Sequence, residues 1–375
     1  MEFRDLKAQY REHKEAIDGA ILTTVAKGQF IGGEPVARLE EALADYVGVK
    51  HCISCANGTD ALSLALMVWD IGPGDAVFVP DFTFFASGEV VAFEGAQPVF
   101  VDVEEDTFNL SPDSLEEAVE KVLAEGKLTP KAVIAVDLFG QPADYGRILP
   151  IVRKYGMKLL EDGAQGFGGG IRGRKACSFG DISTTSFFPA KPLGCYGDGG
   201  ALFTDDDDIA ELLLSLRVHG KGGDKYDNVR VGMNSRLDTI QAAVLQAKLR
   251  AFREYELRDV NRVASRYTEL LSDVVKTPVV PEAFESSWAQ YSILLDNRQE
   301  RDGLQKALKQ QEIPSMIYYP KPMHLQKAFR VEDCVKVDLS VTAGLCDRVL
   351  SLPMHPYLQQ GEQDIVADAV RKFRT

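Results

Sequence analysis

A single lysine lies in surroundings that could turn its amine into a nucleophile. Lys191 stands between two prolines, after an expected strand that ends in two phenylalanines at 187–188 and before the glycine-rich run 194–200. A stiff, apolar turn removes water from an amine, and this desolvation lowers the pKa of the amine. An unprotonated amine can form an imine with an aldehyde. Most lysines are solvated surface groups, and the setting of Lys191 by itself does not exclude that alternative.

Three further features could supply the groups that surround such an imine. Asp162 follows the apolar residues 157–160, where a carboxylate would lie at a strand end, although an aspartate there also commonly caps a turn or helix. Gly58 and Thr59 open a helical pattern whose free N–H groups could bind phosphate, although Asn57 or Thr59 could equally be an ordinary helix cap. The aromatic residues 82–85 could stack on a flat heteroaromatic ring or belong to the core.

Together these groups match the requirements of pyridoxal 5'-phosphate (PLP). This cofactor needs an amine for its imine, a carboxylate at its pyridine nitrogen, a helix start for its phosphate and an aromatic face. The chain contains all four, each at an expected strand end or helix start. A glycine-rich stretch at 168–173 could suggest a dinucleotide site, but it lacks the order of strand, G-x-G-x-x-G and helix.

The elements that must hold these groups follow an α/β pattern. Helical periodicity is clear at 36–47 and 59–69, and short apolar runs predict strands. The runs lie at 76–79, 99–101, 132–136, 158–160, 184–188 and 201–203. Apolar strands separated by helices indicate a mainly parallel sheet that is covered on both faces, with ligands at the carboxyl ends of its strands.

The pattern changes beyond a long amphipathic helix that we expect at 237–272. A strand at 291–295, a helix at 301–311 and another strand at 314–319 predict a smaller α+β domain. We therefore expect two domains, a large PLP-binding domain at 1–250 and a small C-terminal domain at 251–375.

Charge and composition limit the partners. The 375 residues include 42 Lys and Arg against 56 Asp and Glu, and the formal net charge of −14 opposes nucleic acids and anionic membranes as partners. We find neither a membrane-spanning apolar run nor a signal peptide, and we expect a cytoplasmic protein whose six cysteines are thiols. Cys52 and Cys55 have no second pair at metal spacing and the five histidines form no H-x-x-x-H pair, so we expect no metal site.

The chain resembles the DegT/StrS family of PLP-dependent nucleotide-sugar aminotransferases over nearly its whole length, from the opening Phe3-x-Asp5-Leu6-Lys7 onward. The resemblance is carried by the stretches 54–62, 161–165, 186–201, 234–243 and 351–356. Within the family, the branch that aminates UDP-2-acetamido-2-deoxy-3-oxo-glucuronate for lipopolysaccharide O-antigen sugars looks most similar. The resemblance implies a type I PLP aminotransferase fold, a homodimer with shared active sites and L-glutamate as the amino donor.

The family's cofactor residues carry over by position. The resemblance makes Lys191 the Schiff-base lysine, pairs Asp162 with the pyridine nitrogen and places Gln165 near the phenolic oxygen of the cofactor. Phe84 takes the ring-stacking position. Gly163 stands where alanine is usual, and we expect it to loosen the backbone slightly without loss of activity.

Phosphate and substrate contacts are implied in the same way. The implied phosphate-binding residues are Gly58, Thr59, Ser186 and, reaching across from the second subunit, Asn234. The implied substrate-binding residues are Lys221, Arg236, Tyr318, Tyr319 and His324. Arg236 could bind a uronate carboxylate with two parallel hydrogen bonds, or could instead form a structural ion pair with Asp238 or a nearby helix. The basic, glycine-rich loop 219–225 could cover the diphosphate.

Other functions stay open at this point. An aminotransferase for a 4-keto nucleotide sugar would use the same residues on a different substrate. A PLP-dependent sugar dehydratase shares the fold, but relatives of that type carry histidine in place of the lysine, so Lys191 argues against it. A non-catalytic regulator could keep the fold without using the cofactor.

Overall fold

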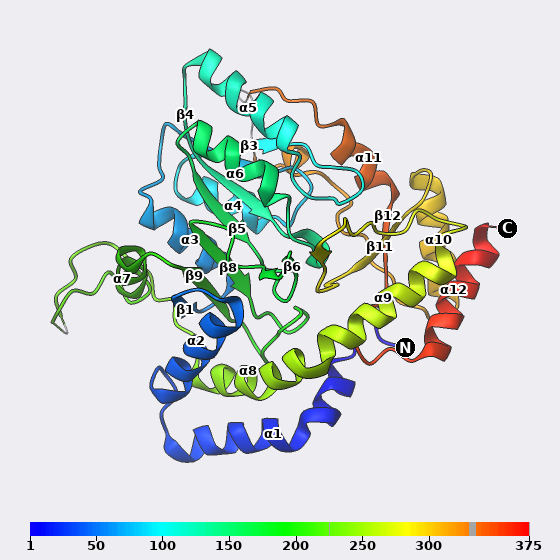
Figure 1. The fold of residues 1–375 in the computed structure, drawn as a ribbon, viewed down its shortest axis with the longest axis horizontal. Coiled ribbons are helices and arrows are strands. Elements are labelled where there is room, and N and C mark those ends of the chain that lie inside the picture. The colour runs from blue at the N-terminus through cyan, green and yellow to red at the C-terminus, as the bar shows by residue number, and fades with distance from the viewer. Residues whose placement is uncertain (225, 330–334, 375) are drawn as a thin grey trace.

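A seven-stranded sheet forms the centre of the molecule (Figure 1). The computed structural model describes residues 1–224, 226–329 and 335–374. The sheet has the strand order β1-β9-β8-β5-β4-β2-β3. Its strands are β1 (His51–Cys55), β2 (Asp75–Pro80), β3 (Gln97–Val101), β4 (Thr129–Val136), β5 (Lys158–Asp162), β8 (Ile182–Ser186) and β9 (Gly200–Thr204). Only β9 runs antiparallel to its neighbours, which confirms the mainly parallel sheet expected from the apolar runs.

Helices cover both faces of this sheet. On one face α3 (Gly58–Val68), α4 (Ala86–Phe93) and α7 (Asp207–Leu216) share a hydrophobic core with the strands. On the other face α5 (Pro112–Glu125) and α6 (Tyr145–Lys154) share a second core with them. Val77 belongs to the first core and its neighbour Phe78 to the second, and both are fully buried. Residues 76–79 of β2 are therefore all apolar, because neither face of the sheet meets water there.

The region beyond the sheet has a core of its own. The long helix that we expected at 237–272 is α8 (Thr239–Ala251), a π-helical turn η2 (Phe252–Glu256) and α9 (Leu257–Leu271). Beyond them follow β11 (Tyr291–Leu294), α10 (Arg298–Gln310), α11 (Ser340–Arg348), β12 (Val349–Leu352) and α12 (Gln360–Arg374). Strand β11 pairs antiparallel with β12, and their buried side chains pack with α9, α10 and α12. The boundary at residue 250 stays a prediction.

The strand that we expected at 314–319 is wrong. Only Met316 forms a β-bridge, to Ser351, and residues 314–319 contain no strand. Pro314 has no N–H to donate and Pro320 follows the segment, so a ladder along β12 cannot extend in either direction.

Short elements and one early helix complete the fold. The short elements are η1 (Leu138–Gly140), η3 (Met323–Leu325), β6 (Gly170–Ile171), β7 (Arg174–Lys175) and β10 (Phe284–Glu285), the last three forming a small sheet. Helix α2 (Glu34–Val47) packs against β1 and α8. Helix α1 (Leu6–Lys27) packs along α8, and the start of the chain lies beside the segment before α12, where the Met354 N–H donates to the carbonyl oxygen of Phe3 (Figure 1).

The loop between α7 and α8 extends away from the body of the molecule (Figure 1). Two isolated bridges fold it back on itself, one between Val218 and Asn234 and one between Lys221 and Asn228. Across the part of the chain that the structure describes, no helix is both long enough and apolar enough to cross a membrane.

Two buried carboxyl groups meet near the carboxyl ends of β4 and β5. Glu161 accepts hydrogen bonds from three backbone N–H groups and from the Ser183 hydroxyl, which lies 2.7 Å away. Asp137 Oδ1 accepts from the Tyr145 hydroxyl at 2.7 Å, but no donor among the described residues reaches Oδ2. Burial raises the pKa of Asp137, and the neighbouring Glu161 charge raises it further. We infer that Asp137 keeps its proton and donates it to Glu161.

We predict that Asp137→Asn flattens the pH dependence of stability. The raised pKa of Asp137 in the folded protein means that folding must hold a proton that the unfolded chain releases above pH about 4, so this residue lowers stability as the pH rises. An asparagine amide can donate to Glu161 without titrating. The free energy of unfolding by urea, measured from mildly acidic to alkaline pH, should therefore fall less steeply in the variant.

The exposed Asp368 offers a matched control, because Asp368→Asn makes the same chemical change outside the core. The control should leave the pH profile unchanged. A profile of Asp137→Asn as steep as that of the wild type would show that Asp137 does not hold the proton.

Candidate active site

Lys191 and Asp162 come from neighbouring strands and interact electrostatically. Asp162 is the last residue of β5, and Lys191 follows β8, with which β5 pairs in parallel. Burial raises the pKa of the Asp162 carboxyl, while Ser87, Ala164 and Lys191 lower it. Burial lowers the pKa of the Lys191 amine, the Asp162 charge opposes this, and the charge of Arg4 adds to it. The direction agrees with the desolvation expected for a proline-flanked turn.

The Asp162 carboxylate is held by a serine that the sequence analysis missed. Ser87, on α4, donates its hydroxyl to Asp162 Oδ2 at 2.9 Å, and the Ala164 N–H donates to Oδ1 at 3.2 Å. Thr83 shares a 3.2 Å hydrogen bond with the Ser87 hydroxyl. A serine on a helix carries no sequence signal of this contact, which exists because the start of α4 lies beside the end of β5.

The side chain of Gln165 has a fixed orientation. Its Oε1 accepts a 2.8 Å hydrogen bond from the backbone N–H of Phe139, which leaves Nε2 as the donor. Nε2 lies 3.2 Å from the Tyr319 hydroxyl. The Tyr319 ring in turn lies 6.3 Å from the ring of Phe84. The structure therefore brings together Gln165, Phe84 and Tyr319, which the sequence assigned separately to cofactor and substrate.

The start of α3 and the end of β8 form a close cradle. Asn57 caps α3 by accepting from the N–H of Asp60 at 2.8 Å, so the cap is Asn57 and not Thr59. A Cβ atom at Gly58 would lie 2.8 Å from Cβ of Ser186. Because Gly58 has no side chain, the Ser186 side chain and the first N–H groups of α3 lie side by side. Such N–H groups can bind a phosphate.

Steric contacts explain why position 163 is glycine, whereas we expected only a slightly looser backbone there. A Cβ atom at this position would lie 2.5 Å from the Cys177 sulfur and 3.0 Å from the carbonyl oxygen of Thr184. The backbone N–H of Gly163 also donates to that carbonyl at 2.9 Å. Cys177 thus occupies the space that an alanine side chain would need, and the glycine accommodates it.

His324 forms a hydrogen-bonded pair with Asp81, another residue that the sequence analysis did not single out as functional. Asp81 is fully buried after β2, and its carboxylate accepts from the backbone N–H of His324 at 2.8 Å and lies 2.7 Å from Nδ1 of the ring. The hydrogen bond to Asp81 raises the pKa of His324, although partial burial opposes it. The pair therefore favours a charged imidazolium.

The predicted residues of the loop before α8 stand apart in the single chain. Asn234, Arg236 and Lys221 are exposed, and no described hydrogen bond or ion pair joins their side chains to Lys191 or Asp162. Within the described ranges no carboxylate lies within ion-pair distance of Arg236, so the alternative of a structural pair with Asp238 is not observed. Lys225, at the end of the expected diphosphate cover, lies outside the described residues.

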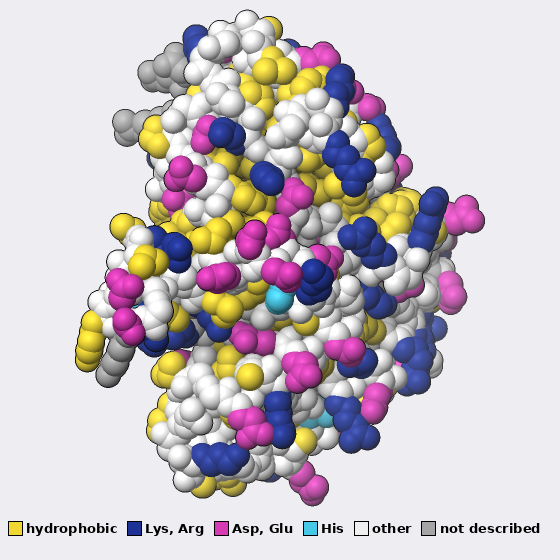
Figure 2. All heavy atoms as spheres, turned by 60° about the vertical axis from the view of Figure 1, so that its left-hand side comes forward, with side chains coloured by type: hydrophobic (Ala, Val, Ile, Leu, Met, Phe, Trp, Pro, Cys, Tyr) yellow, Lys and Arg dark blue, Asp and Glu magenta, His cyan; other side chains and the backbone are white. Residues whose placement is uncertain are grey.

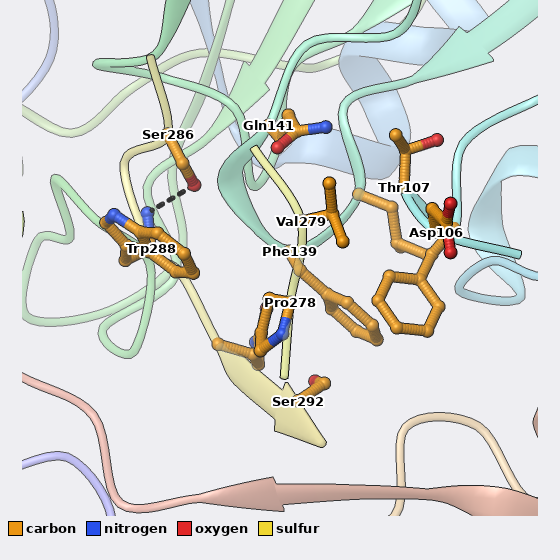
Figure 3. A pocket seen from close by; sticks show the side chains of 12 residues that line it. Asp106, Thr107, Phe139, Gln141, Pro278, Val279, Ser286, Trp288 and Ser292 are labelled. Atoms are coloured by element: carbon orange, nitrogen blue, oxygen red, sulfur yellow. Dashed lines mark hydrogen bonds between the residues drawn. The ribbon is translucent and has the colours of Figure 1, made fainter. Parts of the chain in front are cut away.

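A small hollow elsewhere in the molecule is lined by none of the predicted site residues. It lies where residues 278–292 meet residues 106–108 and 138–141, with Trp288 and Phe139 in its wall (Figure 3). Its volume of about 20 Å³ has room for about one water molecule. It is far too small for a sugar.

Comparison with known proteins adds an independent finding. The model of the DegT/DnrJ/EryC1/StrS aminotransferase family matches residues 11–371. The chain is 44% identical over 373 residues, 99% of each protein, to a UDP-2-acetamido-2-deoxy-3-oxo-D-glucuronate aminotransferase from Pseudomonas aeruginosa. A DegT DnrJ EryC1 StrS aminotransferase structure from Brucella abortus has a TM-score of 0.97 and 50% identity, covering 100% of this chain and 99% of its own. A putative sugar aminotransferase from Streptococcus pneumoniae, in its PLP form, has a TM-score of 0.88 and 25% identity, covering 96% and 97%. The type I fold prediction is confirmed.

We predict that Asp81→Asn lowers the pKa of His324. The substitution removes the negative charge that favours the imidazolium, so His324 should lose its proton at a lower pH than in the wild type. NMR titration of the histidine ring C–H signals measures this, and the other histidine signals serve as internal controls. An unchanged midpoint for His324 would contradict the role given to Asp81.

Proposed function

Given that the chain belongs to the DegT/DnrJ/EryC1/StrS aminotransferase family, we propose that it transfers an amino group from L-glutamate to C3 of UDP-2-acetamido-2-deoxy-3-oxo-glucuronate. The 44% identity to a relative of that name, over 99% of each chain, carries the choice of substrate. The desolvated amine of Lys191 beside the buried Asp162 carries the choice of chemistry. The product would serve lipopolysaccharide O-antigen synthesis. The enzyme would act in the cytoplasm, where its cysteines stay reduced.

The donor set of the site fits PLP. Lys191 would hold the cofactor covalently, and Asp162 would face its pyridine nitrogen. The Nε2 donor of Gln165 suits the phenolic oxygen, and the space that Gly58 leaves beside Ser186 suits the phosphate. When bound, PLP supplies an electron sink that stabilises negative charge on the carbon that carries the amine.

The surrounding residues would complete this arrangement. Thr59 adds an N–H group and a hydroxyl at the start of α3, and Phe84 offers an aromatic face that is 55% exposed. Ser87 fixes the direction of the Asp162 carboxylate, so that the carboxylate can keep a facing nitrogen protonated.

Lys191 would move the proton of the reaction. Its Nζ removes the proton from the carbon that carries the amino group of glutamate, and in the second half-reaction it returns a proton to C3 of the sugar. Because burial lowers the pKa of this amine, more of it is unprotonated at neutral pH and able to act as a base.

The substrate carries several negative charges, and the chain has a net charge of −14, so local cations must attract it. Arg236 is exposed and without a described ion pair, which leaves its planar guanidinium available for a carboxylate. Lys221 lies in the same loop, and His324 is favoured as a cation by Asp81. Tyr318 and Tyr319 precede His324 in the same segment, and the Tyr319 ring lies 5.7 Å from that of Tyr318 and 6.3 Å from that of Phe84.

A homodimer with shared active sites completes the proposal. Large hydrophobic side chains are exposed near the site and on the loop before α8, among them Phe188 at 52% and Val231 at 88%. Figure 2 shows hydrophobic side chains between charged groups on the side of the molecule that carries this loop. A second copy would cover them, and each loop would bring Asn234 and Arg236 to the partner's site.

The alternative functions have less support. Lys191 is present where a sugar dehydratase of this fold would carry histidine, and a relative named for a 3-oxo sugar favours C3 over C4. The deciding experiment offers the purified enzyme UDP- and dTDP-linked 3-keto and 4-keto sugars with glutamate and identifies the products by mass. Amination of only a 4-keto sugar would overturn the proposed substrate.

We predict that Lys191→Ala abolishes transamination and the covalent cofactor. Borohydride reduction of the PLP-loaded wild type should fix the label on the peptide that contains Lys191, and peptide mapping by mass spectrometry reads it. The variant should carry no label and no turnover above background. The control Lys158→Ala removes an exposed lysine of β5 and should keep both the label on the Lys191 peptide and the turnover. Wild-type turnover in Lys191→Ala would end the proposed mechanism.

We predict that Arg236→Lys selectively weakens the uronate. Lysine cannot form two parallel hydrogen bonds with a carboxylate, and one hydrogen bond to a charged group contributes about 1.5–3 kcal/mol, so kcat/KM should fall about tenfold to a hundredfold. The uncharged 3-oxo parent sugar should lose much less.

Arg262 on α9 is exposed and supplies the control Arg262→Lys, which should leave kcat/KM unchanged for both sugars. Equal losses on both sugars in Arg236→Lys would show that Arg236 does not recognise the carboxylate.

A further inference from the structure

Two positively charged side chains from outside the sheet donate hydrogen bonds to the backbone of the turn that contains Lys191. The Arg4 guanidinium donates through Nη2 to the carbonyl oxygen of Lys191 at 2.8 Å and to that of Pro192 at 3.3 Å. The Lys248 amine donates to the carbonyl oxygen of Gly194, just beyond them. Lys248 is 1% exposed. Three carbonyl groups of one short turn therefore point at buried or half-buried positive charge.

A buried carboxylate offsets part of this charge. Glu256 lies in the π-helical turn between α8 and α9 and is 3% exposed. Although burial favours its protonated form, hydrogen bonds from His13, Tyr357 and Gln9 lower its pKa and keep it ionised. Its charge favours the charged forms of both Arg4 and Lys248.

The parts of this cluster come from distant parts of the sequence. Arg4 precedes α1 and Lys248 lies on α8. Tyr357 precedes α12 and donates a hydrogen bond to Glu256. Burial lowers the pKa of Lys248 to about 8, and Glu256 opposes this. Groups this costly to bury usually have partners that only the folded state supplies.

We propose that Arg4 is a positioning residue for Lys191, which with Lys248 and the counter-ion Glu256 fixes the turn that aims the Lys191 amine. The proposal goes beyond the proposed function but depends on Lys191 being its reactive amine. Arg4 touches the backbone of Lys191 and not the reacting atoms, so it acts through Lys191. Its positive charge also disfavours the ammonium form of the neighbouring amine, and thereby favours the nucleophile.

The charged groups that act on Lys191 are few, so the effect of Arg4 can be isolated. Asp162 favours the ammonium form and Arg4 opposes it. Lys248 faces Glu256, Arg4 and the Cys195 thiol, and it contributes to the turn through its hydrogen bond to Gly194. Changing Arg4 therefore changes one of two charges at Lys191.

Three variants separate the charge of Arg4 from its hydrogen bonds. Arg4→Lys keeps the charge, Arg4→Gln keeps a donor without the charge, and Arg4→Met removes both. Arg11→Met is the matched control, because Arg11 lies on α1 with its side chain 69% exposed and forms an ion pair with Asp5 among the described residues. Circular dichroism establishes that each variant is folded, and Arg4→Gln still tests the charge if Arg4→Met does not fold.

The decisive readout is the reactivity of the Lys191 amine in the cofactor-free protein. Competitive labelling with acetic anhydride across pH, quantified by mass spectrometry, gives the midpoint at which Lys191 loses its proton. The midpoint should move to higher pH in Arg4→Gln and Arg4→Met, and stay near the wild-type value in Arg4→Lys and Arg11→Met. An unmoved midpoint in Arg4→Gln would overturn the electrostatic part.

Turnover of the PLP-loaded enzyme tests the positioning part. A misplaced amine can cost on the order of 10²-fold in rate, so kcat should fall by about that factor in Arg4→Met and recover in part in Arg4→Lys. Unchanged kcat in Arg4→Met would overturn the positioning. If borohydride fixed no label on Lys191, the proposed function would fail, whereas the labelling midpoints in the cofactor-free protein would still report on Arg4.

Discussion

The site depends on holding an amine and a carboxylate close together out of water. Burial alone would neutralise both, because it raises the pKa of Asp162 and lowers that of Lys191. Their mutual attraction works against this for both groups. The protein then adjusts each side separately, since Ser87 and a backbone N–H stabilise the carboxylate while Arg4 disfavours the ammonium. As a result, the Asp162 carboxylate can stay charged beside a Lys191 amine that can stay neutral.

The parallel sheet supplies the rigidity that this balance needs. β5 and β8 are neighbours, so the chain segments that carry Asp162 and Lys191 leave the sheet at the same edge. Directly before Asp162, Glu161 is tied by three backbone N–H groups and the Ser183 hydroxyl. A strand end with that many hydrogen bonds has little freedom to turn, which fixes the direction of the next side chain.

Residue type and spacing predicted the parts of the site that lie along the sheet, because strand ends and helix starts follow from local patterns. Lys191, Asp162 and Gly58 belong to that class. Ser87, Asp81 and Arg4 do not, since each acts through a contact between elements that are far apart in the chain. The family resemblance pointed to the opening Phe3-x-Asp5, yet the unspecified position is Arg4 itself. The predicted strand at 314–319 was wrong for a related reason. Its apolar residues suit a strand, but Pro314 has no N–H to donate, and the segment forms one bridge, between Met316 and Ser351.

The same long-range contacts show how the site is closed from outside the sheet. Arg4 reaches it from the start of the chain, and the hydroxyl of Tyr319 and the ring of His324 reach it from the segment before α11, at Gln165 and Asp81. Each contact pairs a residue that follows a strand of the central sheet with a segment outside that sheet. The sheet therefore places these chemical groups, whereas their orientation also depends on the N-terminal segment and on the segment before α11.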